Sequence, residues 1–544
     1  MLLTNQLAAL SPIIRDICAI SGIPGVSLGV LHQNDVVYTA SFGYADMEKE
    51  IPCDCDTAFV LGSLSKAMTA TLLAFIHDDG AIPSWDDPLR SWLPEFRRAD
   101  IYGETTLADL LTHRTGLAPL DSLWLASNNV PFLPRSQAVQ TLAGAPAVRP
   151  FRSHFLYNNF AYEVLAHVIE KASGATFAEV LHNRLLGPLG MKRTYYTGES
   201  RDNEAKPYAS LANASVVRIA PPLSGNDVLM GPAGGIRSSV NDLLILYKAF
   251  MDAAQDEMAQ GGNPGSSSQL NHTLRGVRQL WQGQIPLPSS SLREHSYAFG
   301  WARVQLPGIL APGDDGPSDL NPMVGIGAPS KLAIYHGGDI AGFSTYNALF
   351  PETGSGVVVL TNSLSRNTGV RWICELLIET LFNNSQNAPD YRTVAKESAE
   401  RVVKQFRDVN KSLATGRTIH RPNRPLSAYV GDYRNASGNF FIQIRQNATK
   451  DGLRVAYMGR KADTFELTPY REDSFYWSLT YDETVKLARN PVFPAEYHIL
   501  KFGSEAEQQG ITCLWWNHQS GLAEPGEAFR KVDGNPIRDA PEDL

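Results

Sequence analysis

The sequence predicts an α+β domain, an antiparallel sheet flanked by helices with a helical subdomain beside it, followed by an all-β domain. Strand-like segments stand at both ends of the first 387 residues, and helix-like segments fill the middle of this region. After residue 420, short β-rich runs alternate with turns rich in Gly, Asn and Asp. We therefore expect a first domain at 1–387, a helical linker at 388–420 and an all-β domain at 421–544.

The expected elements of the first domain follow from hydrophobic periodicity. A helix is predicted over 4–20, and a hairpin follows from the runs GVSLGVLH and DVVYTASFG around a polar Gln33-Asn34 turn. The further predicted helices are 65–78, 160–173, 239–252 and 369–383, and the further strands are 331–338, 343–350 and 354–362. Strands so far apart in the chain predict one antiparallel sheet completed late in the sequence.

The remaining segments are predicted as loops, a linker and a β-meander. Segments 255–271 and 306–330 are dense in Gly, Pro, Ser and Asp, which is typical of loops. A polar helix is expected over about 388–415. The β-rich runs after it are NFFIQIRQ, LRVAYMG, DTFELTPY, SFYWSLTY, AEYHILKFG and ITCLWWN. Their regular spacing predicts an up-and-down meander or barrel.

Composition narrows the class of partner. The 544 residues are 43% hydrophobic and 19% charged, with a net charge of −8 and no dense basic run. This balance argues against nucleic acid and against a membrane surface, and it favours a small-molecule acyl substrate. The N-terminus lacks a basic leader before an apolar core, so we expect a cytoplasmic protein. The five scattered cysteines show no zinc spacing, and we expect neither a metal nor a cofactor.

The stretch FVLGSLSKAMT at 59–69 carries a serine and a lysine three residues apart. Ser63 either caps the following helix, with Lys66 on its exposed face, or acts as a nucleophile with Lys66 as its base. Residues three apart on a helix lie on one face, so the two side chains can meet. The helix N-terminus would stabilise an oxyanion, and burial would ease the loss of the lysine proton.

Two further motifs favour the catalytic alternative. Tyr157-Asn158-Asn159 stands just before a predicted helix, and His336-Gly337-Gly338 ends a predicted strand. Together with Ser-x-x-Lys, this order resembles the serine β-lactamase and penicillin-binding-protein superfamily. The stretches DLLTHRTGL at 109–117 and GPAGGIRSSVNDL at 231–243 are similar to its class C-like branch, peptidase family S12, over about residues 5–385. The resemblance implies a β-lactamase/transpeptidase-like fold for the first domain and a lipocalin-like fold for the C-terminal domain.

The resemblance also implies roles for individual residues. Ser63 would form the acyl-enzyme, Lys66 would activate it, and Tyr157 would share the role of base as a phenolate. Asn159 would hydrogen-bond Lys66 and the acyl group. The backbone N–H groups of Ser63 and Asp339, next to Gly337 and Gly338, would form the oxyanion hole. His113 and Arg114 are interpreted as structural residues that shape a turn near the site.

One position departs from the family pattern. His336 stands where β-lactamases carry the lysine of Lys-Thr-Gly, and a largely neutral histidine is a weaker anchor for a substrate carboxylate. We therefore expect a serine hydrolase or acyltransferase acting on an ester, thioester or amide of a small metabolite, with a role in specialised metabolite biosynthesis. The alternatives are a D-amino-acid peptidase or β-lactamase-type amide hydrolase, and a non-catalytic scaffold. We expect the C-terminal domain to cover part of the pocket mouth, and a role in assembly is the alternative.

Overall fold

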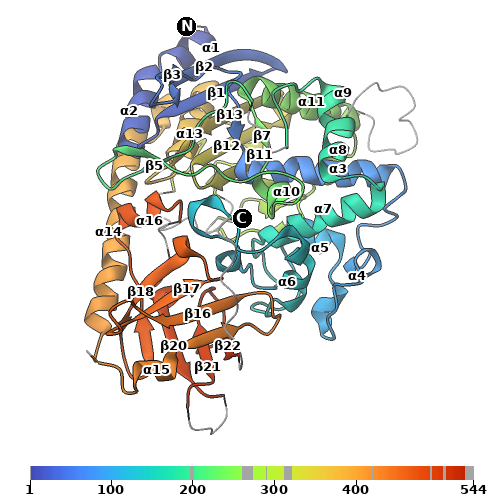
Figure 1. Ribbon diagram of the computed structural model, residues 1–544. Coiled ribbons are helices and arrows are strands. Elements are labelled where there is room, and N and C mark those ends of the chain that lie inside the picture. The colour runs from blue at the N-terminus through green and yellow to red at the C-terminus, as the bar shows by residue number, and fades with distance from the viewer. Residues whose placement is uncertain are drawn as a thin grey trace.

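The computed structural model describes residues 2–196, 201–259, 274–289, 291–311, 321–419, 421–490, 493–505 and 510–532. Figure 1 shows a body of sheet and helices, coloured blue to yellow, above an orange and red barrel. Helix α14 (Tyr391–Gly416) lies along one side of both bodies, in the segment predicted as a helical linker. No helix in the described ranges is long and apolar enough to cross a membrane.

Nine strands form one sheet in the order β3-β2-β1-β13-β12-β11-β10-β9-β8, and every neighbouring pair is antiparallel. The strands are β1 (Gly25–His32), β2 (Asp35–Asp46), β3 (Ile51–Pro52), β8 (Ile285–Pro286), β9 (His295–Tyr297), β10 (Ala302–Leu306), β11 (Lys331–Ile340), β12 (Phe343–Phe350) and β13 (Ser355–Thr361). The predicted hairpin and the three late strands are confirmed. Strands β8 to β10 were not predicted, because two to five residues are too few to show an alternation.

Both faces of this sheet are buried. On β13, Val357 and Val359 belong to the apolar cluster beneath α13, whereas Val358 and Leu360 belong to the cluster on the other face. Successive side chains of a strand point to opposite faces, so a run of apolar residues without polar interruption is what a doubly covered strand requires. Helices α1, α2 and α13 therefore cover one face, and α11 packs on β1 and β13 from the other.

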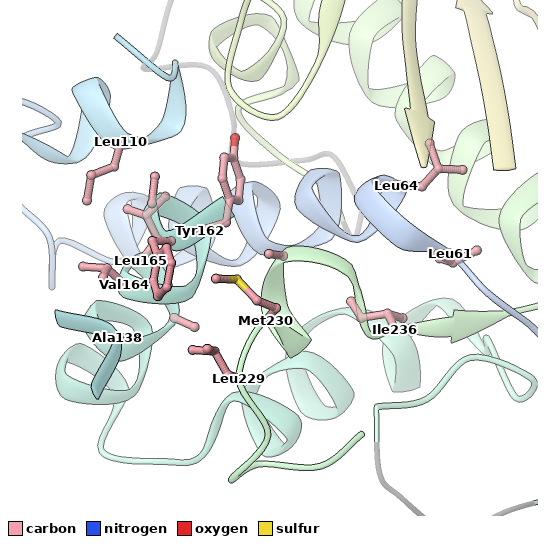
Figure 2. Packing of buried hydrophobic residues seen from close by; sticks show 14 of the residues in the cluster. Leu61, Leu64, Leu110, Ala138, Tyr162, Val164, Leu165, Leu229, Met230 and Ile236 are labelled. Atoms are coloured by element: carbon pink, nitrogen blue, oxygen red, sulfur yellow. The ribbon is translucent and has the colours of Figure 1, made fainter. Parts of the chain in front are cut away.

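The helices of the first body surround this sheet and build the helical subdomain. They are α1 (Leu3–Ala8), α2 (Ser11–Ser21), α3 (Ser65–Asp78), α4 (Leu89–Trp92), α5 (Leu107–Leu111), α6 (Ala138–Gly144), α7 (Asn159–Ser173), α8 (Phe177–Leu181), α9 (Gly187–Leu189), α10 (Gly231–Gly234), α11 (Val240–Ala259), α12 (Val277–Leu280) and α13 (Gly369–Leu381). Short strands complete the body: β4 (Phe59–Val60) with β7 (Arg237–Ser238), and β14 (Ser363–Leu364), β5 (Tyr208–Ser210) and β6 (Val216–Arg218). Figure 2 shows the apolar packing where Leu165 of α7 and Ile236 after α10 lie beside α3.

Two helix predictions were wrong in their extent. The single helix expected at 4–20 is two helices, because Pro12 in the first turn of α2 lacks the N–H that a continuous helix needs. Helix α11 runs to Ala259 and takes the start of the segment predicted as a loop at 255–271, since Ala253-Ala254-Gln255 favour helix. Residues 260–271 of that segment, and 312–320 of the second predicted loop, lie outside the described residues.

The C-terminal body is a closed antiparallel barrel in which each strand pairs with the next in sequence. Its strands are β15 (Gly431–Arg434), β16 (Phe441–Gln446), β17 (Leu453–Tyr457), β18 (Thr464–Pro469), β19 (Ser474–Tyr476), β20 (Ile499–Gly503), β21 (Cys513–Trp516) and β22 (Glu527–Lys531), with helices α15 (Leu426–Tyr429) and α16 (Tyr481–Lys486). The up-and-down barrel agrees with the prediction. The first and last strands, which close it, were missed because they are short and partly polar.

The barrel packs against the helical subdomain. The rings of Phe132 and Phe440 meet edge to face with centroids 5.4 Å apart, inside one apolar cluster that includes residues of both bodies. The backbone N–H of Asn128 donates to the Leu487 carbonyl oxygen at 2.8 Å. Asn439 Nδ2 donates to Thr141 Oγ1, also at 2.8 Å. The barrel therefore shares a core with the segment 120–141 rather than hanging from a linker.

Candidate active site

Ser63 lies in a single 3₁₀ turn, η1 (Gly62–Leu64), directly before α3. Gly62 has a φ of +56°, and a Cβ there would lie 2.6 Å from the Asp339 nitrogen. A Cβ on Gly338 would lie 2.1 Å from the Leu61 carbonyl oxygen and 3.0 Å from the Ser63 nitrogen. The two glycines thus allow strand β11 to approach the turn closely, which brings the backbone of Ser63 and Asp339 together as an oxyanion hole requires.

Strand β11 has an open edge at this point. Its pairing with β10 ends at Tyr335, while its pairing with β12 continues to Ile340. On the side where β10 has ended, the stretch from His336 to Ile340 therefore faces the turn that carries Ser63. Asp339 is exposed, and its carboxylate accepts the Ser344 hydroxyl at 2.6 Å, so its side chain is directed at β12 while its backbone borders the site.

The Ser-x-x-Lys and Tyr-x-Asn motifs meet at the Ser63 hydroxyl. Tyr157 donates its hydroxyl proton to Ser63 Oγ at 2.7 Å, and Lys66 Nζ lies 3.0 Å from the same oxygen. Lys66 Nζ also donates to Asn159 Oδ1 at 2.9 Å and to the Ala233 carbonyl oxygen at 2.8 Å. The structure brings these predicted residues into one hydrogen-bonded unit, as proton transfer from serine to lysine requires.

Lys66 is fully buried, and its burial lowers its pKa from 10.5 to about 7. The carboxylate of Asp121 opposes this fall. An ammonium has three protons and here finds three oxygen acceptors. These hydrogen bonds favour the protonated form, whereas burial disfavours it. The groups that act on this amine are the carboxylate of Asp121, the rings of Tyr157 and Tyr162, and the imidazoles of His113 and His336.

The rate of acylation is expected to rise about tenfold per pH unit below pH 7 and to level off above it. Only the neutral amine of Lys66 can accept the serine proton, and its pKa of about 7 sets where that form becomes the majority. Pre-steady-state release of p-nitrophenol from an activated ester, measured between pH 5 and 9, checks this. A rate that stays constant below pH 7 would contradict Lys66 as the base.

The expectation that Tyr157 acts as a phenolate does not agree with its environment. Burial raises the pKa of Tyr157 well above its usual value, and the hydrogen bond with Ser63 only partly offsets the rise. The hydroxyl is therefore protonated at neutral pH and donates to Ser63. This favours a role for Tyr157 in relaying protons and leaves Lys66 as the base that accepts the Ser63 proton.

The segment around His113 and Arg114 holds Tyr157 in place. The His113 ring packs on the Tyr157 ring with centroids 4.3 Å apart, and its carbonyl oxygen accepts the Leu156 N–H at 2.7 Å. Arg114 pairs with the buried carboxylate of Asp109 at 2.7 Å. These contacts agree with the structural interpretation of both residues. Asn158 then caps α7 by accepting the Ala161 N–H, which sets Asn159 in the first turn.

Sequence reasoning missed two carboxylates that support the site. Asp121 Oδ1 accepts Asn159 Nδ2 at 3.2 Å and Trp124 Nε1 at 2.8 Å. Glu163 Oε2 accepts the Met230 N–H at 2.7 Å, at the start of the turn that presents the Ala233 carbonyl oxygen to Lys66. Neither stands in a recognisable motif. The structure buries Glu163 on the inner face of the helix that also carries Asn159. That burial would mark it as a supporting residue, but it is visible only once the fold is known.

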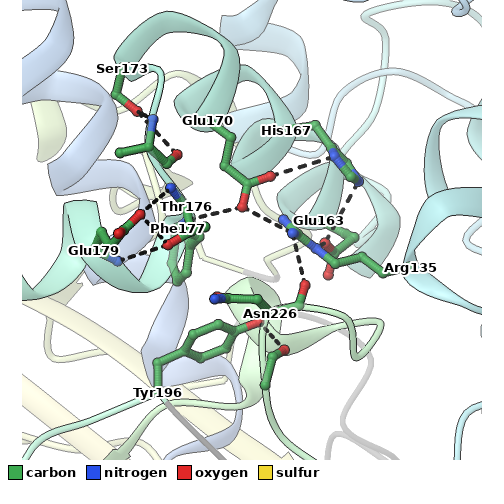
Figure 3. A network of polar contacts seen from close by, with 12 residues as sticks. Arg135, Glu163, His167, Glu170, Ser173, Thr176, Phe177, Glu179, Tyr196 and Asn226 are labelled. Atoms are coloured by element: carbon green, nitrogen blue, oxygen red, sulfur yellow. Dashed lines mark hydrogen bonds and ion pairs between the residues drawn. The ribbon is translucent and has the colours of Figure 1, made fainter.

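Figure 3 shows how Glu163 is held. Arg135 Nε donates to Glu163 Oε1 at 2.6 Å, and Arg135 Nη1 donates to Glu170 Oε1 and to the Asn226 carbonyl oxygen, each at 3.0 Å. The network ties α7 to the segment that leads into α10. Removing one partner of a buried ion pair is costly, so the network fixes the Ala233 carbonyl oxygen relative to α7.

His336 does not offer a positive charge to a substrate. It is 2% exposed, its Nε2 lies 2.9 Å from the Tyr297 hydroxyl, and its Nδ1 lies 2.5 Å from the Gly337 carbonyl oxygen. A carbonyl only accepts, so Nδ1 carries the proton and Nε2 accepts from Tyr297. Burial lowers the pKa of His336 to about 4. The imidazole is neutral at pH 7, as we expected of a histidine at the position where the family motif has lysine.

An apolar pocket lies beside these residues. Its walls come from the helical subdomain, from the strand end after Asp339 and from the barrel body, and they are Trp124, Leu125, Ala126, Asn129, Val130, Pro131, Pro222, Leu223, Leu229, Met230, Gly231, Gly235, Ile340 and Ala488. Gly235 directly follows Gly234, where an added Cβ would lie 3.6 Å from the Gly62 backbone next to Ser63. The pocket therefore adjoins the nucleophile, and Ala488 makes the barrel body part of its wall.

Comparisons with known proteins found a matching family model and similar chains. The family model described as Beta-lactamase matches residues 11–372. The chain is 26% identical over 438 residues to the unguisins hydrolase ungD of Aspergillus violaceofuscus, covering 76% of this chain and 72% of that one. It is 26% identical over 353 residues to the D-alanyl-D-alanine-carboxypeptidase/endopeptidase AmpH of Escherichia coli, covering 64% and 82%.

A solved structure supports the fold. The octameric penicillin-binding protein homologue from Pyrococcus abyssi superposes with a TM-score of 0.55 at 20% identity. The match covers 87% of this chain and 94% of that one, which is more than the sheet and its helices alone. The fold of the first body is thus the β-lactamase/transpeptidase-like fold that the motifs implied.

Proposed function

Because this chain belongs to the beta-lactamase family of serine hydrolases, we propose that it cleaves an amide or ester bond of a small metabolite through an acyl-Ser63 intermediate. The observation that carries the proposal is the hydrogen-bonded unit of Ser63, Lys66 and Tyr157. A scaffold that had lost its activity would have no need to keep a lysine buried with a lowered pKa beside a serine hydroxyl.

The geometry supports a two-step reaction. Ser63 Oγ attacks the substrate carbonyl carbon while its proton passes to Lys66, and the backbone N–H groups of Ser63 and Asp339 stabilise the oxyanion. The bond to the leaving group then breaks as that group takes the proton, relayed by the Tyr157 hydroxyl. Water attacks the acyl-enzyme, gives a proton to Lys66 and releases the acid, and the proton returns to Ser63. Transfer to an alcohol or amine would use the same intermediate.

Two features support an uncharged, apolar acyl group. The neutral His336 supplies no cation for a carboxylate, and the pocket beside Ser63 is lined almost entirely by apolar side chains. The relatives support the wider class: one is described as a hydrolase of unguisins and another as a carboxypeptidase and endopeptidase. We therefore propose a specialised metabolite with an apolar acyl side chain as the substrate, and a D-amino-acid peptidase activity as the alternative.

A panel of p-nitrophenyl esters and a carboxylate-bearing β-lactam tests this proposal. We expect kcat/KM to rise about tenfold from acetate to butyrate, because two further methylenes enter the pocket at about 0.8 kcal/mol each. The β-lactam is expected to react at least about tenfold more slowly than the butyrate ester, since its carboxylate finds no charge-assisted hydrogen bond at His336.

A matched pair of leucine variants locates the effect. Leu223 at the pocket rim is 44% exposed, and Leu223→Ser is expected to lower the ratio of butyrate to acetate turnover. Leu292 is fully exposed and does not line the pocket, so Leu292→Ser is expected to keep the ratio of the unmodified protein. Equal turnover of all the esters, or faster turnover of the β-lactam, would contradict the proposed substrate class.

A further inference from the structure

A buried histidine of the barrel body contacts a turn that borders the active site. His518 follows β21, its Nδ1 lies 2.6 Å from the Ser122 hydroxyl oxygen, and its Nε2 lies 2.7 Å from Glu527 Oε2 at the start of β22. Ser122 and His518 are 2% and 3% exposed. A carboxylate only accepts, so in the neutral ring Nε2 donates to Glu527 and Nδ1 accepts from Ser122. The Trp516 ring, 4.8 Å away, packs on the imidazole.

Ser122 belongs to a turn that also carries a residue of the site. The 3₁₀ turn η3 (Asp121–Leu123) is a single turn, and Leu120 before it has a φ of +55°. An isolated turn of this length has no stability of its own, and a left-handed leucine adds strain. Its position is therefore set by the side chains that anchor it, which include the buried Leu120 and Leu123 as well as two polar residues. Ser122 anchors it to the barrel, and Asp121 connects it to Asn159.

We propose that His518 is a positioning residue for catalysis, which holds the Asp121 turn so that Asn159 stays directed at Lys66. The chain of contacts runs from Glu527 through His518 to Ser122, along the backbone to Asp121, and through Asn159 to Lys66. The C-terminal body then completes the active site and does more than cover it. The inference rests on the proposed function of Ser63 and Lys66.

Ser122, His518 and Glu527 have the residue types of a hydrolytic triad, so a second nucleophile is the rival explanation. The burial of Ser122 opposes it, because a substrate carbonyl must reach the hydroxyl. A fluorophosphonate separates the two. We expect labelling on Ser63 and none on Ser122, and a label on Ser122 in the folded protein would overturn the positioning role.

The test compares full-length variants, each of which removes one contact between the two bodies. His518→Ala breaks the contact that leads to Asp121, and Asn439→Ala breaks the contact with Thr141, which does not. We expect acylation of His518→Ala by p-nitrophenyl butyrate to be slowed at least tenfold at its plateau, and that of Asn439→Ala by less than twofold. Ser122→Ala is expected to behave like His518→Ala, and Ser122→Thr, which keeps a hydroxyl, to recover most of the rate.

The pH profile separates positioning from a general loss of stability. Asp121 raises the pKa of Lys66, so a displaced Asp121 lets that pKa fall further and moves the acid limb of the rate profile to lower pH. We expect this shift in His518→Ala and not in Asn439→Ala. Identical profiles and rates in the two variants would overturn the inference.

Hydrogen exchange gives a result that does not depend on activity. The amides of residues 120–126 are expected to exchange faster in His518→Ala than in Asn439→Ala, because only the first variant releases the turn. If the unmodified protein is never acylated on Ser63, the proposed function fails while this measurement still decides whether His518 holds the Asp121 turn. Equal exchange in both variants would overturn that role by itself.

Discussion

Ser63→Ala is expected to leave no covalent adduct after exposure to a fluorophosphonate and to lower ester turnover by at least about a thousandfold. Ser63 is the hydroxyl that both Tyr157 and Lys66 contact, at 2.7 and 3.0 Å. Without that oxygen no acyl-enzyme forms, and the remaining groups provide only binding and electrostatic stabilisation. Intact-protein mass spectrometry and initial rates measure the two quantities.

Ser65→Ala is the matched control for this experiment. Ser65 lies two residues along the same motif, is fully buried, and accepts the Ile236 N–H at 3.2 Å. We expect this variant to lose some stability but to keep the adduct on Ser63. An adduct of equal yield on Ser63→Ala would show that the nucleophile lies elsewhere in the chain.

Lys66→Ala and Tyr157→Phe are each expected to lower the acylation rate by about 10²–10⁴-fold, and the double variant to lose little more than the worse of the two. The reason is that the two groups serve one proton transfer at the same oxygen. When the base is absent, a relay has no proton to pass on. A double-mutant cycle on the pre-steady-state acylation rate measures the coupling.

The choice of phenylalanine isolates the hydroxyl. The Tyr157 ring packs on His113 and lies 4.9 Å from Lys66 Nζ, and both contacts survive when only the oxygen is removed. Thermal midpoints of the single variants report whether any loss comes from unfolding. Losses that add in the double variant would mean that Lys66 and Tyr157 act in separate steps.

Local spacing explains what the sequence could predict. Ser63 and Lys66 are one helical turn apart, and Tyr157 and Asn159 flank a helix start, so each pair is positioned by an element that its own neighbours specify. The contact of Ser122 with His518 joins residues 396 positions apart and depends on how two bodies dock. The same limit applies to Asp121, whose role is visible only once Asn159 lies beside it.

Environment, rather than position, explains where the sequence misled. A neighbouring cation would favour the phenolate of Tyr157, but burial of the side chain and the carboxylates of Asp121 and Asp339 raise its pKa and keep its proton in place. Strand β10 has only five residues, whose alternating buried and half-buried positions average out in any longer window. Its identity depends on β11, which supplies the pairing that a short strand cannot find alone.

The two end strands of the nine-stranded sheet affect how readily copies of the protein aggregate. The outermost strands, Ile51–Pro52 and Ile285–Pro286, are two residues long and both end in proline, which has no N–H to offer a neighbouring chain. The barrel is closed, with β15 paired to β22, so its described strands present no edge at all. These two end strands and the closed barrel therefore offer a newly made chain few templates for strand addition.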